Sequence, residues 1–420
     1  MSVQVRQGYK WTEAGVIPNE WSIKRLGDLA TVGSGGTPSR EKAGYWNGLI
    51  PWITTSQIDF NTITYADQFI TVEGLQNSAA KLLPAGTLLM ALYGQGKTRG
   101  KVGVLGIEAA TNQACASISL TGGISREFAL HFLASRYESI RNSSNTGGQE
   151  NLNGQIVKDT PVVLPPISEQ RAIAAALSDM DALISGLDQL IAKKRNIKQA
   201  AMQQLLTGEQ RLPGFSGEWK VKRLGEIGVF LKGSGVRRDQ SLSGDLPCIR
   251  YGEIYTVHND YIREFKSYIS VAVSEDAVLI ECGDIMFAGS GETKEDIGKS
   301  VSFIDDIEAY AGGDIVILRP KNVDSLFLGY ALNTPKISRQ KASRGQGDAV
   351  VHISASALAT IEVLMPNQAE QTAIANILSD MDGELATLET KRNKIRQLKQ
   401  GAMQQLLSGK IRLSNEDKKI

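Results

Sequence analysis

The sequence predicts an α+β protein in which two globular domains are separated by a pair of long antiparallel coiled-coil helices. The first observation is an internal duplication, because residues 169–212 reappear as residues 370–413 with 24 of 44 positions identical and no gap. Unrelated segments of ordinary composition would share roughly 3 such positions. Both copies also carry an apolar heptad pattern, and short β-type runs between glycine-rich turns precede each of them. Because both copies keep one register, the domains are expected to be related by a pseudo-two-fold axis.

Each copy is predicted to form one helix. The first would run from Ser168 to Leu206, which is 39 residues and about 58 Å at the usual rise per residue. Apolar residues recur in steps of four and three, which is typical of a coiled-coil seam. A lone helix with such a stripe usually packs on its own domain's core, but two matching helices in one chain favour pairing with each other. The predicted seam consists of Ile173, Leu177, Met180, Ile184, Leu187, Ile374, Leu378, Met381, Leu385 and Leu388.

Basic residues cluster in the C-terminal half of both predicted helices. They are expected to be solvated and to interact favourably with the helix dipole, with contact to DNA or to another subunit as a second possible role. The residues are Lys193, Lys194, Arg195, Lys198, Lys391, Arg392, Lys394, Arg396 and Lys399.

Bulk composition predicts a soluble protein of two or three domains. Of the 420 residues, 42% are hydrophobic and 22% are charged, which is ordinary for globular proteins. The N-terminus has no apolar signal region and no stretch approaches 18 apolar residues, so neither secretion nor membrane insertion is expected. The three cysteines, Cys115, Cys248 and Cys282, and three histidines show no zinc-ligand spacing. They predict no metal site and a reducing cytoplasm.

The duplication covers whole halves of the chain. Trp21 and the following Leu26-Gly27 reappear as Trp219 and Leu224-Gly225. Most loop residues differ between the halves, which suggests one architecture reading two targets, although drift after duplication would leave the same pattern. The expected divisions are a lead-in (1–19), a first domain (20–160), a first helix region (161–212), a second domain (213–362), a second helix region (363–413) and a tail (414–420).

Two lysine-containing loops resemble nucleotide-binding loops only in part. Gly96-Lys97-Thr98 has Ala91 where the phosphate-binding loop requires its first glycine, and Gly298-Lys299-Ser300 has Thr293 there. The loop Gly33–Pro38 also lacks the dinucleotide spacing. We therefore expect no nucleotide site.

The same glycine loops suit DNA. Open backbone N–H groups beside lysine and arginine can contact phosphates, and glutamine and arginine can read base edges. Each loop alone is more simply a solvated turn, but four such loops in repeated positions favour a DNA-binding surface. The candidate DNA-binding residues are Thr37, Arg40, Thr54, Ser56, Gln57, Gln95, Lys97, Thr98, Arg99, Lys101, Gln113, Arg237, Arg238, Arg250, Tyr251, Lys294 and Lys299.

Catalytic motifs find no match in the sequence. There is no Asn/Asp-Pro-Pro-Tyr/Phe motif for methyl transfer to an amino group, no G-x-S-x-G, and no cluster of carboxylates spaced for metal-dependent phosphodiester cleavage. The chain is therefore predicted to have no catalytic residues of its own.

The two helix regions, with LPPISEQRAIAAALSDMDALI and KKRNIKQAAMQQLLTG in the first, resemble the spacer regions of the specificity subunit of type I restriction-modification enzymes. The Gly36–Ser39 loop and the starts at Trp21 and Trp219 resemble that family's target recognition domains. The resemblance implies that each domain reads one half of a bipartite, asymmetric site in double-stranded DNA while the helices fix the gap. It further implies docking of two modification subunits, which bind S-adenosylmethionine, and through them of restriction subunits, which use ATP and Mg²⁺. This chain would bind no cofactor and would not be an enzyme.

Two other functions stay open on the residues alone. One is a DNA enzyme with an unrecognised active site. The other is a cytoplasmic scaffold that uses the coiled coil to hold partners other than DNA.

Overall fold

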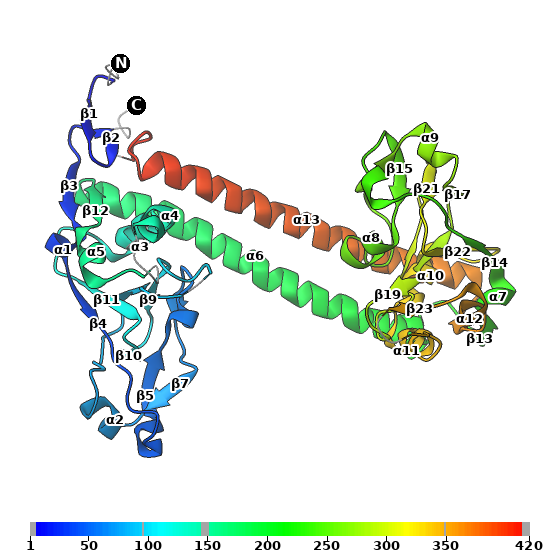
Figure 1. The fold of residues 1–420 in the computed structure, drawn as a ribbon, viewed down its shortest axis with the longest axis horizontal. Helices are drawn as coiled ribbons and strands as arrows, with labels where there is room; N and C mark the ends of the chain where they lie inside the picture. Colours follow the sequence, from blue (N-terminus) through cyan, green and yellow to red (C-terminus); the bar gives the residue numbers. More distant parts are fainter. Residues whose placement is uncertain (1–5, 95, 144–150, 348–349, 414–420) are drawn as a thin grey trace. The chain divides into compact units, whose positions relative to one another are not determined.

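A computed structural model describes residues 6–94, 96–143, 151–347 and 350–413 (Figure 1). The chain forms two compact units. Unit 1 comprises Met1–Asp188 and Thr390–Ile420, and unit 2 comprises Gln189–Glu389. Two long helices, α6 (Ile167–Thr207) and α13 (Gln368–Leu406), each contribute to both units. Their 41 and 39 residues match the predicted helices to within a few residues, because the heptads and the flanking prolines and glycines mark their ends.

Unit 1 is built on two sheets. The larger has the order β4-β11-β8-β9-β6 and the smaller the order β10-β5-β7. Their strands are β4 (Ala30–Ser34), β5 (Trp46–Ile53), β6 (Thr62–Ile63), β7 (Gln68–Ile70), β8 (Leu88–Ala91), β9 (Val102–Leu105), β10 (Ala110–Thr111) and β11 (Cys115–Leu120). Two strand pairs complete the unit, β1 (Tyr9–Thr12) with β2 (Gly15–Pro18) and β3 (Ser22–Arg25) with β12 (Pro161–Leu164).

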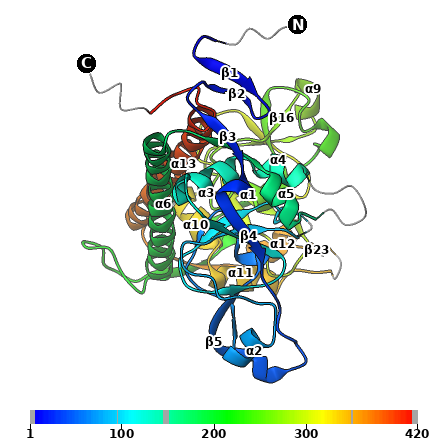
Figure 2. The ribbon, with the colours of Figure 1, turned by 90° about the vertical axis from the view of Figure 1, so that its left-hand side faces the viewer.

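Short helices surround these sheets. They are α1 (Leu26–Leu29), α2 (Val72–Gln76), α3 (Arg126–Ser135), α4 (Tyr137–Asn142), α5 (Gly154–Asp159) and the 3₁₀ turns η1 (Ala43–Tyr45) and η2 (Thr55–Gln57). Figures 1 and 2 both show α3, α4 and α5 gathered near the start of α6, whereas β5 and α2 lie at the opposite end of the unit.

Unit 2 repeats this arrangement. Its sheets have the orders β14-β22-β18-β20 and β16-β15-β21-β17, so the order of the larger sheet matches that of β4-β11-β8-β9. The strands are β13 (Lys220–Arg223), β14 (Gly228–Lys232), β15 (Leu246–Ile249), β16 (Ser267–Ile269), β17 (Val278–Ile280), β18 (Ile285–Ala288), β19 (Ser290–Gly291), β20 (Ser300–Ser302), β21 (Ala309–Ala311), β22 (Ile315–Pro320), β23 (Val351–His352) and β24 (Glu362–Met365). The helices are α7 (Leu224–Ile227), η3 (Arg238–Gln240), α8 (Tyr251–Thr256), α9 (Val271–Ser274), α10 (Ser325–Leu332), α11 (Pro335–Ala342) and α12 (Ala355–Ala359).

The core of each unit contains the first turns of one long helix and the last turns of the other. In unit 1, Ile173 and Leu177 of α6 pack in the same cluster as Leu406 of α13. In unit 2, Ile374 and Leu378 of α13 pack with the end of α6. The first residues of the predicted seam therefore serve their own domain's core as well as the helix pair. Farther along the helices, Leu187 and Leu385 are buried and Met180, Ile184, Met381 and Leu388 are half-buried.

Ion pairs show that the long helices are antiparallel, as predicted. In unit 1, Asp181 pairs with Lys399 and Asp188 with Arg392 and Arg396. In unit 2, Lys194 pairs with Glu384, Arg195 with Glu389 and Lys198 with Asp382. The expectation of simple solvation was wrong for these six basic residues, because carboxylates of the facing helix meet them, whereas Lys193, Lys391 and Lys394 are exposed as expected. The exposed pairs contribute little free energy, so their main effect is to fix the register, whereas the pair of Lys198 with Asp382 is largely buried.

A buried carboxylate anchors the first turn of each long helix. Glu169 is 1% exposed and accepts hydrogen bonds from Trp21 Nε1 at 3.0 Å and from Arg412 Nε at 2.8 Å. Burial by itself would raise the pKa of Glu169, but the hydrogen bonds from Arg412 and Trp21 bring it below its usual value. Glu370 makes the same contacts with Trp219 and Arg211 in unit 2.

No helix of the described residues is both long and apolar enough for a membrane span.

We predict that Glu169→Gln lowers the free energy of unfolding by roughly 2–3 kcal/mol, because Arg412 loses its buried partner. The folded-state pKa of Glu169 is depressed, so this contribution is present above pH 4.5 and is lost as pH falls through the folded pKa. Denaturant unfolding near neutral pH measures it. The control is Glu13→Gln, whose pair with Arg25 is half-exposed and should change stability by less than about 0.5 kcal/mol. Equal effects of the two substitutions would contradict the anchoring role.

Candidate nucleic-acid interface

The candidate loops of unit 1 leave one edge of its larger sheet, which we call loop edge 1. β4 ends at Ser34 opposite Ala116, and β8 ends at Ala91 opposite Cys115. The loops that follow β4 and β8 and the residues that precede β11 therefore meet there. The parallel pairing of β5 with β10, with Ile53 opposite Thr111, brings the residues after β5 to the same edge.

Unit 2 has an equivalent edge, loop edge 2. Lys232 at the end of β14 lies opposite Val316, and Ala288 at the end of β18 lies opposite Ile315. The parallel pairing of β15 with β21 places Arg250 and Tyr251 beside these loops. The structure thus gathers the sequence-predicted residues of each half at one place.

A glycine begins the first loop at both edges. A Cβ at Gly35 would lie 2.0 Å from the carbonyl oxygen of Thr111, and one at Gly233 would lie 2.1 Å from that of Gly312. Neither position has room for a side chain, so the loops can approach the neighbouring backbone only as glycine.

The first loop of edge 1 holds polar side chains in fixed positions. Thr37 donates to Gln113 Oε1 at 2.5 Å, and Arg40 Nη2 donates to Gln68 Oε1 at 2.8 Å. The Arg40 guanidinium also lies 3.7 Å from the centroid of the Trp46 ring, which is a cation–π contact. Thr37, Arg40 and Gln113 are exposed, so the structure brings together three predicted residues in a pre-ordered arrangement.

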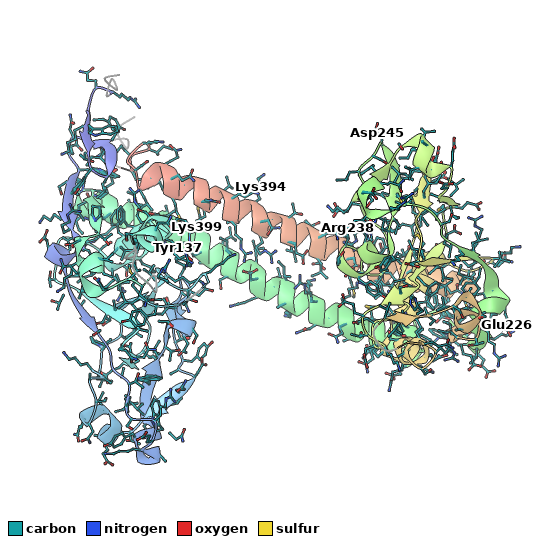
Figure 3. All side chains as sticks on the ribbon, viewed as in Figure 1. Tyr137, Glu226, Arg238, Asp245, Lys394 and Lys399 are labelled. Carbon is teal, nitrogen blue, oxygen red and sulfur yellow. The ribbon has the colours of Figure 1, made fainter. Side chains whose placement is uncertain are left out.

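The loop after β8 is less uniform than predicted. Lys97 is exposed and Thr98 is half-buried. Lys101 pairs with Asp59 at 2.6 Å, and Arg99 is only 5% exposed, so neither presents a free cation at the surface. Gln95 lies outside the described residues. Figure 3 labels Tyr137 of α4, whose hydroxyl donates to the Lys97 carbonyl oxygen at 2.6 Å and so fixes this loop.

The side chains of the residues after β5 form hydrogen bonds mainly with groups nearby in the sequence. Thr54 and Ser56 share a hydrogen bond of 2.7 Å, and Gln57 Nε2 donates to the Tyr65 carbonyl oxygen at 3.1 Å. Only Ser56 is exposed, so this segment offers fewer groups than its composition suggested.

Loop edge 2 presents a different set of side chains. Arg237, Arg238 and Lys294 are exposed, Tyr251 is 38% exposed and Arg250 is half-buried; Figure 3 labels Arg238.

Lys299 points inward instead, because its ammonium donates to the His258 carbonyl oxygen at 2.7 Å. Burial lowers the pKa of Lys299. This lysine fixes the loop rather than extending from it.

Several supporting residues carry no signal in the sequence. Lys341 of α11 is 1% exposed and donates to the Gly298 carbonyl oxygen at 2.7 Å, yet it lies in a basic stretch that appears solvent-facing. Trp46 and Gln68, which hold Arg40, come from two strands whose pairing the sequence does not reveal.

The chemistry available at the edges is recognition. Exposed arginine, lysine and glutamine can bind phosphates and the edges of bases. Burial raises the pKa of the Cys115 and Cys248 thiols to about 12, so neither is a thiolate nucleophile near neutral pH. Within the described parts of the chain, no group of three or more His, Cys, Asp or Glu side chains is arranged to hold a metal ion.

Comparison with known proteins places both halves in one family. A family described as the type I restriction modification DNA specificity domain matches residues 18–194 and again residues 216–397. The MjaIX type I restriction enzyme specificity subunit of Methanocaldococcus jannaschii is 27% identical over 306 residues, 65% of this chain and 68% of that protein. The MjaVIII specificity subunit of the same organism is 22% identical over 95% of each chain. The crystal structure of a type I restriction-modification S subunit from M. genitalium has the same fold, with a TM-score of 0.61, 16% identity and coverage of 96% of this chain and 98% of that one.

Lys341 should give the protein a distinct pH dependence. Burial lowers the pKa of Lys341 from 10.5 to about 7, so above pH 7 the unfolded chain binds a proton that the folded chain lacks. The contribution of Lys341 to stability should therefore rise with pH between about 7 and 10.5 and be constant below 7, where both states bind the proton. We expect Lys341→Met to flatten this rise in thermal midpoints between pH 7 and pH 8.5. Lys336→Met, an exposed lysine of the same helix, is the control and should keep the rise. The same slope in both variants would contradict the assignment.

Proposed function

Because the chain belongs to the type I restriction modification DNA specificity family, we propose that it is the subunit that selects the DNA sequence on which a type I restriction-modification complex acts. Unit 1 reads one half of a bipartite, asymmetric site in double-stranded DNA, and unit 2 reads the other half. The partners are DNA, two modification subunits and, through them, restriction subunits. The complex works in the cytoplasm.

One observation carries the proposal of two different readers. The two loop edges share one framework, from the order of the strands to the glycines at 35 and 233, but their exposed side chains differ. Edge 1 offers Thr37, Gln113 and Arg40, whereas edge 2 offers Arg237 and Arg238. Because the two loop edges have the same backbone framework but different exposed side chains, they support recognition of two half-sites that differ in sequence.

The side chains at edge 1 suit direct reading of bases. Arginine binds guanine through O6 and N7, and glutamine binds adenine through N6 and N7. Holding Arg40 on Trp46 and Gln68 reduces the conformational entropy lost when it binds a base. Lys97 and Lys294 suit phosphate contacts, which add affinity without sequence preference.

The long helices fix the gap between the half-sites and provide the surface for the modification subunits. Half-sites one turn of DNA apart are about 34 Å centre to centre. The 41 residues of α6 span about 61 Å, so the helix has length left over for docking.

Methylation and cleavage belong to the partner subunits, with their S-adenosylmethionine, ATP and Mg²⁺. We propose that this chain binds none of these cofactors and catalyses no step. Incubating the purified chain with labelled S-adenosylmethionine, or with Mg²⁺ and target DNA, tests this, because turnover by the chain alone would identify an enzyme. Absence of binding to duplex DNA in the presence of modification subunits would instead favour a scaffold.

Arg40→Ala should relax one base position of one half-site and weaken binding by about 1–3 kcal/mol there. Lys97→Ala, the control from the same edge, should weaken binding to all sequences equally and reduce its salt dependence. The recognised site is first read from the methylated sequences of a host that carries this chain and its modification subunit. Titration of the purified complex with the site and its single-base variants then measures both effects. A uniform loss in Arg40→Ala would show that Arg40 contacts phosphate rather than a base.

Inserting one heptad after Asp188 and another after Glu389 should widen the recognised gap and leave both half-sites unchanged. Seven helical residues add about 10.5 Å, which corresponds to about three base pairs at the 3.4 Å spacing of DNA. Sequencing of methylated sites made by the variant measures the gap. A changed half-site with an unchanged gap would count against the helices as a ruler.

A further inference from the structure

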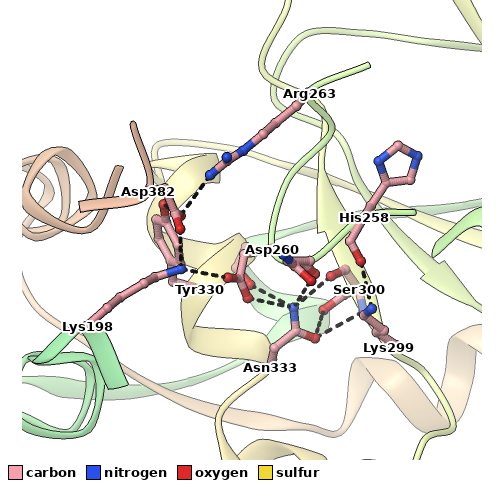
Figure 4. Close-up of polar contacts among 11 residues, drawn as sticks. Lys198, His258, Asp260, Arg263, Lys299, Ser300, Tyr330, Asn333 and Asp382 are labelled. Atoms are coloured by element: carbon pink, nitrogen blue, oxygen red, sulfur yellow. Dashed lines mark hydrogen bonds and ion pairs between the residues drawn. The ribbon is translucent and has the colours of Figure 1, made fainter. Parts of the chain in front are cut away.

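A chain of buried polar contacts in unit 2 connects the paired long helices to a candidate DNA loop (Figure 4). The segment of residues 289–299 connects β18 to β20 and contains the two-residue strand β19, and we call it loop 289–299. The chain begins at Lys198 of α6. Its ammonium lies 2.7 Å from Asp382 Oδ1 of α13 and 3.5 Å from Asp260 Oδ2, which belongs to the segment between α8 and β16. Lys198 therefore joins both long helices to the globular part of the unit.

Asn333 continues the chain toward the loop. Its Nδ2 donates to Asp260 Oδ1 at 3.2 Å and to the Ser300 carbonyl oxygen at 2.8 Å. Its Oδ1 accepts hydrogen bonds of 3.2 Å from both the backbone N–H and the hydroxyl of Ser300. Ser300 is fully buried and is the first residue after the loop. Three hydrogen bonds between Asn333 and Ser300 therefore fix the point at which the chain leaves loop 289–299.

The last two residues of the loop are held in the same way. Lys299 donates to the His258 carbonyl oxygen at 2.7 Å, and Lys341 donates to the Gly298 carbonyl oxygen at 2.7 Å. The middle of the loop is exposed, including Lys294. The loop thus has an exposed middle, in which Lys294 stands among the carboxylates of Glu292, Glu295 and Asp296, on a buried base that is connected to Lys198.

Charge makes Lys198 necessary to this arrangement. Burial raises the pKa of Asp260, and the nearby Asp382 acts in the same direction, whereas Lys198 and Asn333 lower it. Asp382 has a second cation, because Arg263 lies 3.2 Å from its Oδ2. Among the described side chains, Lys198 is the cation that pairs with Asp260. Without it, Asp260 must take up a proton or move, and either change disturbs its contact with Asn333.

Unit 1 has the same ion pair between the helices. Lys399 and Asp181 occupy the duplicated positions of Lys198 and Asp382, and the Lys399 ammonium lies 2.5 Å from Asp181 Oδ1 and 2.7 Å from Oδ2.

Unit 1 lacks the rest of the chain. Asn61 accepts from Val104 N as Asp260 accepts from Ser302 N, and so replaces the carboxylate by an amide. Ala134, nine residues after the N-cap Ser125, takes the place of Asn333, nine residues after the N-cap Asp324. A cleft of about 740 Å³ in unit 1 has Asn61 and Asp181 among its lining residues, and a smaller cleft of about 360 Å³ in unit 2 is lined in part by Lys198, Asp260 and Asn333. The same helix pair is therefore connected to a loop in unit 2 and not, by this route, in unit 1.

We propose that Lys198 is a positioning residue for the second reader. Acting through Asp260 and Asn333, it sets the position of loop 289–299, so that the long helices take part in reading the half-site of unit 2. This inference rests on the proposed function, because it assigns a role within the reading of DNA.

The test compares Lys198→Met with the matched variant Lys399→Met. Each is made in the full chain and purified with its modification subunits. Duplexes with the complete site, or with one base changed in either half-site, are titrated at a temperature well below unfolding. Unit 2's half-site is identified as the one whose selected sequence changes when the exposed Arg237 and Arg238 are replaced. We expect Lys198→Met to lower discrimination at that half-site about tenfold, within the range for contacts that act indirectly, and to leave the other within twofold.

Lys198→Arg should restore the discrimination, and Lys399→Met should leave both half-sites unchanged. A merely structural role would affect both half-sites together or neither, and either result overturns the proposal. If Lys198→Met does not fold, Ser300→Ala, which removes one hydrogen bond to Asn333, must show the same one-sided loss, and its absence also overturns the proposal. A wild-type complex that prefers no DNA sequence would instead refute the proposed function itself.

Discussion

The structure depends on the exchange of helix ends between two cores. The core of unit 1 contains the start of α6 and the end of α13, and the core of unit 2 contains the start of α13 and the end of α6. Burying a leucine or isoleucine side chain contributes about 1.5–3 kcal/mol, so each unit gains much of its stability from residues distant in sequence. Unit 1 includes Thr390–Ile420, which follow all residues of unit 2 in the sequence. The core of each unit therefore depends on the helix pair, and a substitution in a part of either helix that belongs to these cores should change the stability of the unit that contains it.

Backbone and burial constraints explain which parts of the duplicated halves stayed alike. Glu169 and Glu370 are fully enclosed and each accepts from one tryptophan and one arginine. Replacing such a group leaves a buried donor without a partner, which costs several kcal/mol. Gly35 and Gly233 lie so close to a neighbouring carbonyl oxygen that neither position has room for a Cβ. The exposed side chains at the loop edges, such as Lys97 and Arg238, are free of these constraints because they face solvent until a ligand binds. The framework could not diverge without loss of the fold, whereas the edges could.

The long helices were the most predictable part of the chain. Their heptads, prolines and terminal glycines act locally, and the predicted helix from Ser168 to Leu206 differs from α6 by one residue at each end. The charge pairs were not predictable in the same way. The partners of Lys198 are Asp260 and Asp382, which are 62 and 184 residues away in the sequence. A local sequence pattern cannot predict contacts over such separations.

The candidate DNA residues show the same limit of sequence reasoning. Glycine loops with basic residues were expected to share one surface, and their positions at the two loop edges agree with the repeat. Composition did not reveal which cations face outward. Arg40 is held on Trp46, Arg99 is 5% exposed and Lys299 donates to a carbonyl oxygen of the fold. Exposure of a long side chain depends on which backbone oxygen or carboxylate lies within its reach, and this is a property of the folded chain.

The duplicated ion pairs, Lys198 with Asp382 and Lys399 with Asp181, have different neighbours in the two units. Six residues after the N-caps of α3 and α10 stand His131 and Tyr330. Tyr330 donates to Asp382 Oδ2 at 2.7 Å and joins the helix to the core by a strong, fully paired contact. Burial and Lys399 lower the pKa of His131 to about 4, so at neutral pH it is uncharged and shares a hydrogen bond with Ser178 at 3.1 Å. Asp181 pairs with Lys399, but Asn61 stands in unit 1 where Asp260 gives Lys198 a second carboxylate in unit 2. Satisfied polar networks specify one arrangement, and in unit 2 such a network extends from Lys198 of the long helix to Asp260 and Asn333.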